Sequence, residues 1–279
     1  MDRLEGHRQW FARLVTASAG VPPTEERLIA AFASTPRERF LDAGPWRVFT
    51  RAGYIETPSD DPALIYQDVM VALKSEAQIN NGQPSLHAVC LATLAVKDGE
   101  TVVHVGAGTG YYSAVLARLT GSTGRVFAYE IDQGLAARAR GNLSGYPNVE
   151  VLHRSGADGP LPACDVVYVN AGATAPLTVW LDPLRPGGRL LFPLTPAQGV
   201  GFMLLVTRSA TDRLAARFVC STMFTPCIGG RDEETAQPLS EAFARGGIGT
   251  VRSLYLDTTP DATCWFAGRS WWLSTSGIE

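Results

Sequence analysis

Three glycines at alternate positions, Gly106, Gly108 and Gly110, stand where this sequence is best suited to bind a ligand. Glycine lets a backbone turn sharply and lie close against a bound molecule, since it has no side chain that would collide with it. An acidic residue, Glu130, comes later at the end of an apolar run. A carboxylate in this position accepts hydrogen bonds from the hydroxyl groups of a ribose. The glycines and the acid together therefore predict a nucleoside site.

The segments around the glycines predict the elements that would hold such a site. Thr101–Val105 is β-branched and apolar, as expected of a strand that is buried on both faces of a parallel sheet. Tyr111–Leu119 has the apolar spacing of a helix, and Arg125–Tyr129 is a second strand that ends at Glu130. This order of strand, glycine turn, helix and strand is typical of the first half of a nucleotide-binding βαβ unit.

The spacing of the glycines bears on which nucleoside is bound. A dinucleotide site has the pattern G-x-G-x-x-G or G-x-G-x-x-A, whereas Tyr111 takes the place of the last residue here. NAD is disfavoured on this ground, although it stays open. The pattern G-x-G-x-G followed by an acid resembles the S-adenosylmethionine site of the Rossmann-like methyltransferases. An alternative without a ligand also stays open, in which the glycines only make a tight turn between strand and helix.

The rest of the chain predicts the α/β class. Strand and helix patterns alternate beyond Glu130, which indicates a mostly parallel, twisted, Rossmann-like sheet with helices on both faces. Phe202–Thr207 and Arg217–Phe224 follow one another without a helix and predict a terminal antiparallel hairpin. We expect three segments: a helical region at residues 1–60, a methyltransferase domain at 61–230 and a small C-terminal extension at 231–279.

Three local predictions concern the segments outside the central domain. Arg47–Asp61 is rich in turn formers and is expected to be irregular. Gly229–Pro238 is the clearest boundary by composition. Beyond it, a helix is expected at Ser240–Ala244 and strands at Ser253–Leu256 and Cys264–Leu273.

Composition narrows the classes of function. The 279 residues carry a formal net charge of −3 and show no run of lysine and arginine, which argues against a nucleic-acid partner. No apolar run is long enough to cross a bilayer, and the N-terminal residues do not resemble a secretory signal. Five scattered cysteines and four dispersed histidines match no metal or disulfide pattern. We therefore expect a cytoplasmic protein that binds neither nucleic acid, nor membrane, nor metal.

The loop before Pro84 is a second candidate for chemistry. Polar residues and a glycine precede this proline, which is a favourable first residue for the helix that Leu86, Val89, Leu91 and Leu94 would bury. The free N–H groups at a helix N-terminus favour anions. The same pattern also fits a solvated loop that leads into a well-formed helix.

Several motifs together resemble one family, the protein-L-isoaspartate O-methyltransferases. They occur in the same order as in that family, from Thr35 to Gly230: Pro36-Arg37-Glu38-Arg39-Phe40, Tyr66-x-Asp68, the loop before Pro84, Gly106–Tyr111, Pro186–Leu190, Phe202–Arg208 and Phe224–Gly229. The resemblance implies transfer of a methyl group from S-adenosylmethionine to a carboxylate of a peptide or protein, with S-adenosylhomocysteine as the product.

The resemblance also implies roles for individual residues. The cofactor would be bound by residues of the glycine turn, of the acid that follows the second strand and of two later turns: Gly106, Ala107, Gly108, Thr109, Gly110, Glu130, Ile131, Asp158 and Asn170. Asn81, Gly82 and Ser85 would form the catalytic wall beside the transferred methyl group. Tyr66, Asn80, Gln83 and His87 would contact the substrate.

This chain departs from the family at two places. The family commonly reads I-S-x-P, and Gly82 of Asn81-Gly82-Gln83-Pro84 stands in the place of the serine. The resemblance also ends near Gly230, before a tail that contains Trp265, Trp271 and Trp272. These aromatic residues either complete a core or form a surface for a particular peptide.

We take these departures to favour a dedicated enzyme over general repair. The expected reaction is methylation of a normal aspartate of a ribosomally made peptide, with the ester leading to a succinimide. One alternative is an L-isoaspartyl repair methyltransferase. Another is a binding module that keeps the cofactor pocket but has lost catalysis.

Overall fold

The computed structural model describes residues 3–211 and 213–278, and these have the α/β fold that the sequence predicts. Contacts divide the chain into two compact units. The first unit contains the chain up to Glu100 together with Ala107–His153, and the second contains Thr101–Gly106 together with the chain from Arg154 onward. The predicted division at residues 60 and 230 stays a prediction. In the described part of the chain, no helix is both long and apolar enough to cross a membrane.

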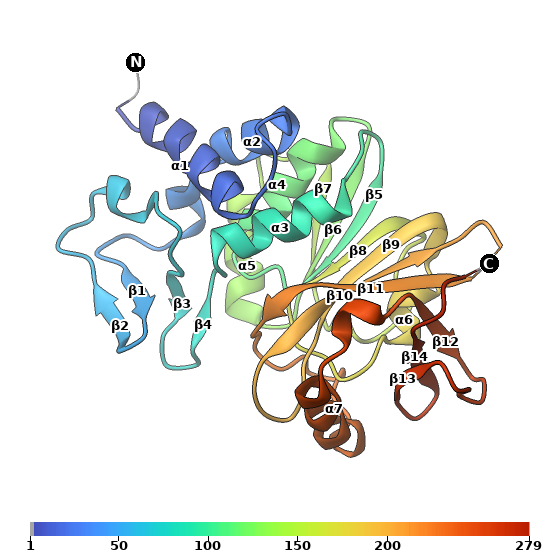
Figure 1. Cartoon of the computed structure of the whole chain (residues 1–279). Coiled ribbons are helices and arrows are strands. Elements are labelled where there is room, and N and C mark those ends of the chain that lie inside the picture. The colour runs from blue at the N-terminus through green and yellow to red at the C-terminus, as the bar shows by residue number, and fades with distance from the viewer. Residues whose placement is uncertain (1–2, 212, 279) are drawn as a thin grey trace. The chain divides into compact units, whose positions relative to one another are not determined.

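The first unit is mainly helical (Figure 1). Helix α1 packs on α2 and α3, and helices α4 and α5 pack on the parallel strands β6 and β7. Two hairpins, β1–β2 and β3–β4, complete it. The bounds are α1 Glu5–Ser18, α2 Glu26–Ala33, α3 Pro84–Leu94, α4 Tyr111–Thr120, α5 Gln133–Asn142, β1 Arg47–Thr50, β2 Gly53–Glu56, β3 Ala72–Lys74, β4 Ile79–Asn80, β6 Arg125–Glu130 and β7 Val149–His153, with 3-10 turns η1 Arg37–Phe40 and η2 Pro62–Ile65.

The second unit is built on a mixed sheet. Its strand order is β13-β14-β12-β11-β10-β9-β8-β5. Strands β5, β8 and β9 are parallel to one another, and every neighbouring pair from β9 to β13 is antiparallel. The bounds are β5 Thr101–Val105, β8 Cys164–Val169, β9 Leu184–Leu194, β10 Gly201–Arg208, β11 Leu214–Thr222, β12 Ser253–Leu256, β13 Cys264–Ala267 and β14 Trp271–Ser274, with helices α6 Thr178–Leu181 and α7 Glu233–Arg245 and the 3-10 turn η3 Ile248–Thr250.

The predicted elements around the glycines are confirmed. Strand β5 has the expected bounds, α4 extends one residue beyond the prediction, and β6 ends at Glu130. The bounds of β5 were predictable because its residues are β-branched and apolar, and Val102 and Val103 are indeed fully buried. The antiparallel hairpin β10–β11 is confirmed as well.

Three local predictions are wrong. Part of Arg47–Asp61 forms the hairpin β1–β2, in which Phe49 faces Tyr54 across the strands. The expected helix Ser240–Ala244 is too short, because α7 already begins at Glu233 and contains Pro238 in its second turn. Pro238 lies beyond the first turn, because Ala236 N–H already bonds to the Asp232 carbonyl, and it therefore leaves the helix without one intrahelical hydrogen bond. Cys264–Leu273 is divided into β13 and β14 by a turn at Gly268.

The C-terminal extension belongs to the core of the second unit. Phe202 and Phe218 of the hairpin contact Phe243 of α7, and Phe218 also contacts Trp265 of β13. Trp272 is only 3% exposed, and it stacks on Tyr255 with 4.4 Å between ring centroids. The aromatic residues at the end of the chain therefore fill a core, which is the first of the two predicted alternatives for them.

The packing of Trp272 leads to a stability prediction. Trp272→Ala is expected to lower the free energy of unfolding by about 3–5 kcal/mol, because it leaves a large cavity beside Tyr255. Met223→Ala is the matched control in the same unit, since Met223 is 76% exposed and its truncation is expected to change stability by less than about 0.5 kcal/mol. Denaturant unfolding measures both values, and an equal small effect would show that the extension is not part of this core.

Candidate cofactor and peptide site

The glycine turn adopts backbone conformations that require glycine. Gly106, Gly108 and Gly110 have φ angles of +76°, +57° and +96°, a region that residues with a side chain rarely enter. Protein atoms lie close to all three. A Cβ atom on Gly110 would lie 2.7 Å from Leu143 Cδ1, one on Gly106 would lie 3.2 Å from the carbonyl oxygen of Asn170, and one on Gly108 would lie 3.2 Å from Leu73 Cδ1. These glycines are therefore needed for the packing of the protein itself.

Glu130 is held directly beside the turn. Its Oε2 accepts a hydrogen bond of 2.7 Å from the Gly108 N–H, and its Oε1 accepts one of 2.9 Å from the Asp132 N–H. The residue is 7% exposed. Burial raises the pKa of Glu130 from 4.5, and these backbone hydrogen bonds oppose that shift.

Glu130 and the nearby Asp132 have different partners in the structure. Asp132 forms an ion pair with Lys74 and accepts a 2.9 Å hydrogen bond from Leu135 N–H at the start of α5. The hydrogen bond from Lys74 is the main reason that the pKa of Asp132 is lowered. Each oxygen of Glu130 accepts one backbone N–H and keeps a second lone pair. Glu130 therefore fits the two hydroxyl groups of a ribose, whereas Asp132 caps a helix.

Other predicted cofactor residues of the first unit support the turn. Ala107 N–H donates to Tyr129 O at 3.0 Å, which fixes the turn to the end of β6. The Thr109 hydroxyl donates to Phe40 O at 2.6 Å, and Thr109 O accepts from Asn142 Nδ2 at 2.9 Å. Ile131 is 43% exposed and offers an apolar surface of the kind that a flat base can cover.

The second unit contains the remaining predicted cofactor residues. Asn170 follows β8, and its Nδ2 donates at 2.7 Å to Nε2 of His104 on β5. Burial lowers the pKa of His104 to about 3, so the ring is neutral at pH 7 and its Nε2 can accept this bond. Asn170 Oδ1 is buried and has no hydrogen-bond partner within the described chain. An orphaned buried acceptor suits an amino group such as that of a methionine moiety.

Asp158, the other predicted cofactor residue of the second unit, is exposed in the turn after Arg154.

The predicted peptide-side residues lie around the start of α3. Asn81 is 9% exposed, and its Oδ1 accepts a 2.8 Å hydrogen bond from Val71 N–H. Its Nδ2 is buried without a hydrogen-bond partner among the described residues, so one donor of this side chain is left for a ligand. Asn80 Oδ1 accepts from Gly82 N–H at 2.9 Å and holds the loop in its turn.

The helix N-terminus already has an anion of its own. Asp68 Oδ1 accepts a 2.8 Å hydrogen bond from the Ser85 N–H, and Asp68 Oδ2 accepts one of 2.6 Å from the Ser85 hydroxyl. Gln83 Nε2 donates to the same carboxylate at 3.0 Å. The predicted preference of α3 for an anion is thus met by Asp68, and Ser85 and Gln83 are oriented by it.

Gly82 and His87 occupy complementary space. Gly82 has a φ angle of +74°, and a Cβ atom there would lie 2.1 Å from Nε2 of His87. The His87 ring is buried and stacks on Tyr112 with 3.6 Å between centroids. The imidazole therefore takes the space in which the side chain of a serine at position 82 would begin.

Tyr66 lies in the core and not at a surface. Its hydroxyl donates to Glu38 and accepts 3.2 Å hydrogen bonds from Arg8 Nε and from Arg37 N–H. Burial is the main reason that the pKa of Tyr66 is raised. This geometry gives Tyr66 a positioning role, and its predicted contact with substrate stays a prediction.

Arg37, Phe40 and Asp68 contact residues of the predicted site, although the prediction did not include them: Arg37 lies 3.4 Å from Asn81 Oδ1. Phe40 holds the glycine turn and Asp68 holds the start of α3, as described above. The motifs Pro36–Phe40 and Tyr66-x-Asp68 contained the signal, but their partners became visible only in the folded chain.

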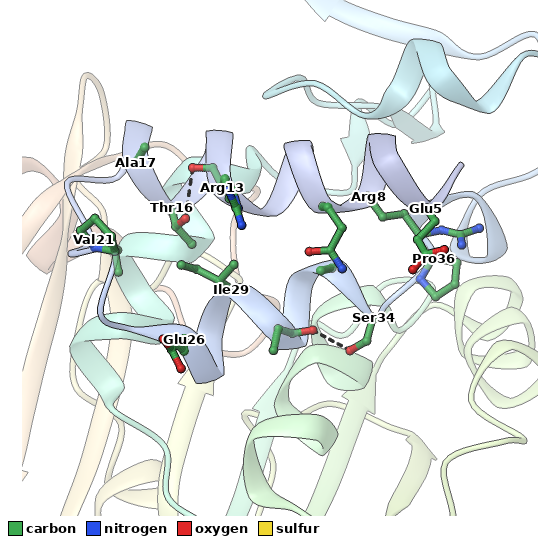
Figure 2. Close-up of a pocket in the computed structure, with 14 residues that line it drawn as sticks. Glu5, Arg8, Arg13, Thr16, Ala17, Val21, Glu26, Ile29, Ser34 and Pro36 are labelled. Carbon is green, nitrogen blue, oxygen red and sulfur yellow. Dashed lines mark hydrogen bonds between the residues drawn. The ribbon is translucent and has the colours of Figure 1, made fainter. Parts of the chain in front are cut away.

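Two concave surfaces of the first unit lie outside the predicted residues. One is a groove of about 960 Å³ between α1 and α2. Figure 2 shows side chains of both helices directed toward it, with Arg13, Thr16 and Ile29 in the space between the helices. Glu5, Arg8, Arg13 and Glu26 give its lining both signs of charge. The other groove is formed by α2, α4 and the connection from α5 to β7.

A Rossmann-like sheet with a glycine turn and a buried acid defines the class of the S-adenosylmethionine-dependent methyltransferases. The fold is shared by a protein-L-isoaspartate O-methyltransferase of known structure, with a TM-score of 0.65 and 23% identity over 90% of this chain and 73% of that one. It is also shared by a putative protein-L-isoaspartate O-methyltransferase from Plasmodium falciparum in complex with S-adenosyl-L-homocysteine, with a TM-score of 0.64 and 14% identity over 80% of this chain and 98% of that one.

Sequence comparisons give the family. The family model described as protein-L-isoaspartate(D-aspartate) O-methyltransferase matches residues 18–232. A protein-L-isoaspartate O-methyltransferase of Aeropyrum pernix is 31% identical over 74% of this chain and 74% of its own length. One of Brucella anthropi is 28% identical over 74% of this chain and 88% of its own length. The chain therefore belongs to the protein-L-isoaspartate(D-aspartate) O-methyltransferase family, and it is an O-methyltransferase that uses S-adenosylmethionine.

The pair of Gly82 and His87 leads to a prediction on stability. Gly82→Ala is expected to cost about 1–2 kcal/mol for its positive φ and a further ~1–3 kcal/mol for overlap with His87. Gly20→Ala is the matched control, because Gly20 has a φ of +66° and open space around it. It should show the backbone cost alone in denaturant unfolding. Adding His87→Ala should remove the excess cost, and strict additivity of the two changes would contradict the predicted overlap.

The position of Glu130 leads to a prediction on cofactor binding. Glu130→Gln is expected to weaken S-adenosylmethionine binding by about 10- to 100-fold, because it removes a charged acceptor from the ribose hydroxyls. Isothermal titration calorimetry measures this change. Glu150→Gln on β7 is the control, since Glu150 is exposed and its replacement should leave the dissociation constant unchanged. An unchanged affinity in Glu130→Gln would show that this acid does not hold the ribose.

Proposed function

We propose that the protein methylates the free carboxylate of L-isoaspartyl residues in peptides or proteins. The observation that carries the proposal is the family match over residues 18–232, which includes the glycine turn, Glu130 and the loop before α3. The relatives from Aeropyrum pernix and Brucella anthropi bear the name of this activity. This is the alternative to the normal-aspartate reaction that the sequence led us to prefer.

The chemistry of the acceptor fits the residues that are present. An aspartyl-type carboxylic acid with a pKa of about 4 is ionised at pH 7, so its oxygen can attack without a general base. When bound, S-adenosylmethionine supplies an electrophilic methyl group on its sulfonium. Glu130 would hold the ribose, and the glycine turn would let the cofactor lie close to the backbone. The main contribution of the protein is to align the carboxylate for in-line attack and to exclude water.

The peptide side offers one donor for the incoming carboxylate. Asn81 Nδ2 is buried without a hydrogen-bond partner in the described chain, while Asn81 Oδ1 is fixed by Val71 N–H. A donor held in this way can orient a carboxylate oxygen with little loss of side-chain entropy. Ser85 is turned toward Asp68 and contributes by fixing the start of α3.

A second candidate is methylation of a normal aspartate that leads to a succinimide. The fit of His87 against Gly82 favours it, because the space in which a serine side chain would begin holds an imidazole instead. In this reaction the backbone nitrogen of the following residue attacks the ester carbonyl. The bond to the methoxy group breaks, and methanol leaves with the amide proton.

Mass spectrometry of two peptides that differ only in the linkage of one aspartate separates the two candidates. Each peptide is incubated with the enzyme and S-adenosylmethionine, and Glu130→Gln serves as the control with impaired cofactor binding. Gain of one methyl group on the isoaspartyl peptide alone is the expected result. Methylation of the normal aspartyl peptide followed by loss of methanol would instead establish the second candidate. No methylation of either peptide would overturn the proposal.

A further inference from the structure

The second groove of the first unit is strongly positive. It has a volume of about 1360 Å³ and is formed by α2, α4, the turn after α4 and the connection from α5 to β7. Arg27, Arg39, Arg118 and Arg125 line it, and no aspartate or glutamate is among its described lining residues. The whole chain has a formal net charge of −3, so this positive charge is local. We call this surface the arginine groove.

Most of this charge is not neutralised by the protein. Arg27 pairs with Asp98 at 3.0 Å, but both side chains are more than half exposed and such pairs are weak. Arg118 Nε donates to the Thr35 hydroxyl at 3.1 Å, and its guanidinium lies 5.5 Å from the centre of the Tyr146 ring. Arg39 and Arg125 are exposed and have no ion pair within the described chain. The groove therefore presents cations that an outside anion can reach.

This surface is not predictable from the sequence alone, because its arginines are far apart along the chain. They come from α2, η1, α4 and the start of β6. The groove between α1 and α2 provides a comparison within the same unit, since its charges are of both signs. The charged residues that line the arginine groove are thus all positive, whereas those that line the other groove are of both signs.

The size and the lining of the groove favour an extended ligand. Small-molecule pockets have volumes of about 300–1,000 Å³, so a single small anion would leave most of this groove empty. Guanidinium groups form paired hydrogen bonds with carboxylates, and here they are distributed over four elements. Pro36 and Pro147 add apolar surface between them. A peptide segment with several acidic side chains matches this combination of separated cations and apolar surface.

The groove also shares residues with the support of the glycine turn. Phe40 O accepts the hydrogen bond from Thr109, and Asn142 Nδ2 donates to Thr109 O. Both residues line the arginine groove. A segment bound there would lie within the same unit as the turn and in contact with residues that hold it.

We propose that the arginine groove binds an acidic segment of the peptide that carries the methyl-accepting residue. By naming a property of the substrate, this inference rests on the proposed function. The groove would add affinity for acidic substrates through contacts separate from the carboxylate that is methylated.

Binding can be measured without any methyl transfer. The probe is a fluorescent peptide of alternating glutamate and glycine, which contains no aspartate, and its twin has glutamine in place of glutamate. Fluorescence anisotropy compares the wild type with the groove variant Arg39→Gln/Arg118→Gln/Arg125→Gln. The charge-matched control variant is Arg13→Gln/Arg47→Gln/Arg51→Gln, whose three arginines are exposed residues of the same unit outside the groove.

The groove variant is expected to bind the acidic peptide about tenfold more weakly, because it loses three exposed charge contacts that are each weak. The control variant should bind like the wild type, and the glutamine peptide should bind weakly to all three proteins. Equal losses in both variants, or equal binding of the two peptides, would overturn the inference. Tighter binding of a single-stranded oligonucleotide than of the acidic peptide in the same groove would also overturn it.

Two further measurements keep the result independent of folding and of the proposed function. Arg39→Gln/Arg125→Gln leaves the contacts of Arg118 intact and should still weaken binding about threefold, and an unchanged affinity would contradict the inference. With methyl-accepting peptides, an added glutamate-rich flank should lower KM for the wild type and not for this double variant, while kcat is the same in both. Absence of methylation would refute the proposed function but would leave the anisotropy results unaffected.

Discussion

The buried guanidinium of Arg37 is the interaction on which the peptide side of the first unit depends. Its nitrogens donate to the carbonyl oxygens of Ile65, Gln67 and Val69, and one lies 3.4 Å from Asn81 Oδ1. The side chain is fully buried, so these acceptors replace the water that a cation would otherwise bind. Burial is the main influence that lowers the pKa of Arg37, although a guanidinium stays protonated in proteins.

This single cation connects two motifs that are separate in the sequence. By holding the backbone on both sides of Asp68, it places the carboxylate that caps α3 through Ser85. By contacting Asn81, it also helps to fix the side chain whose Nδ2 has no hydrogen-bond partner within the described chain. A lysine could not make these contacts in the same way, because only the planar fork of arginine reaches several carbonyls at fixed angles. The geometry at the peptide side is therefore set by a residue that is itself out of reach of solvent.

The sequence predicted the elements that depend on local pattern. Strands β5 and β12 have the expected bounds, and the glycines of the turn have the positive φ angles that their type suggests. What it did not reveal depends on contacts between distant residues. The overlap of Gly82 with His87, the cap that Asp68 supplies to α3 and the gathering of four arginines all arise from tertiary packing, which hydrophobic periodicity does not encode. Helix α7 was underestimated for a local reason, since Pro238 was interpreted as a boundary although it lies early in the helix.

The short strand β13 has a consequence for association of the chain with others. The outermost strand of a sheet exposes a row of unpaired N–H and C=O groups, which is a template for pairing with another polypeptide. Here that position belongs to β13, which has four residues and an irregular register with β14 between Cys264 and Phe266. The longer strands β9, β10 and β11 lie further inside the sheet. The C-terminal extension thus gives this edge of the sheet a short and irregular strand, which is a poor template for pairing with another polypeptide.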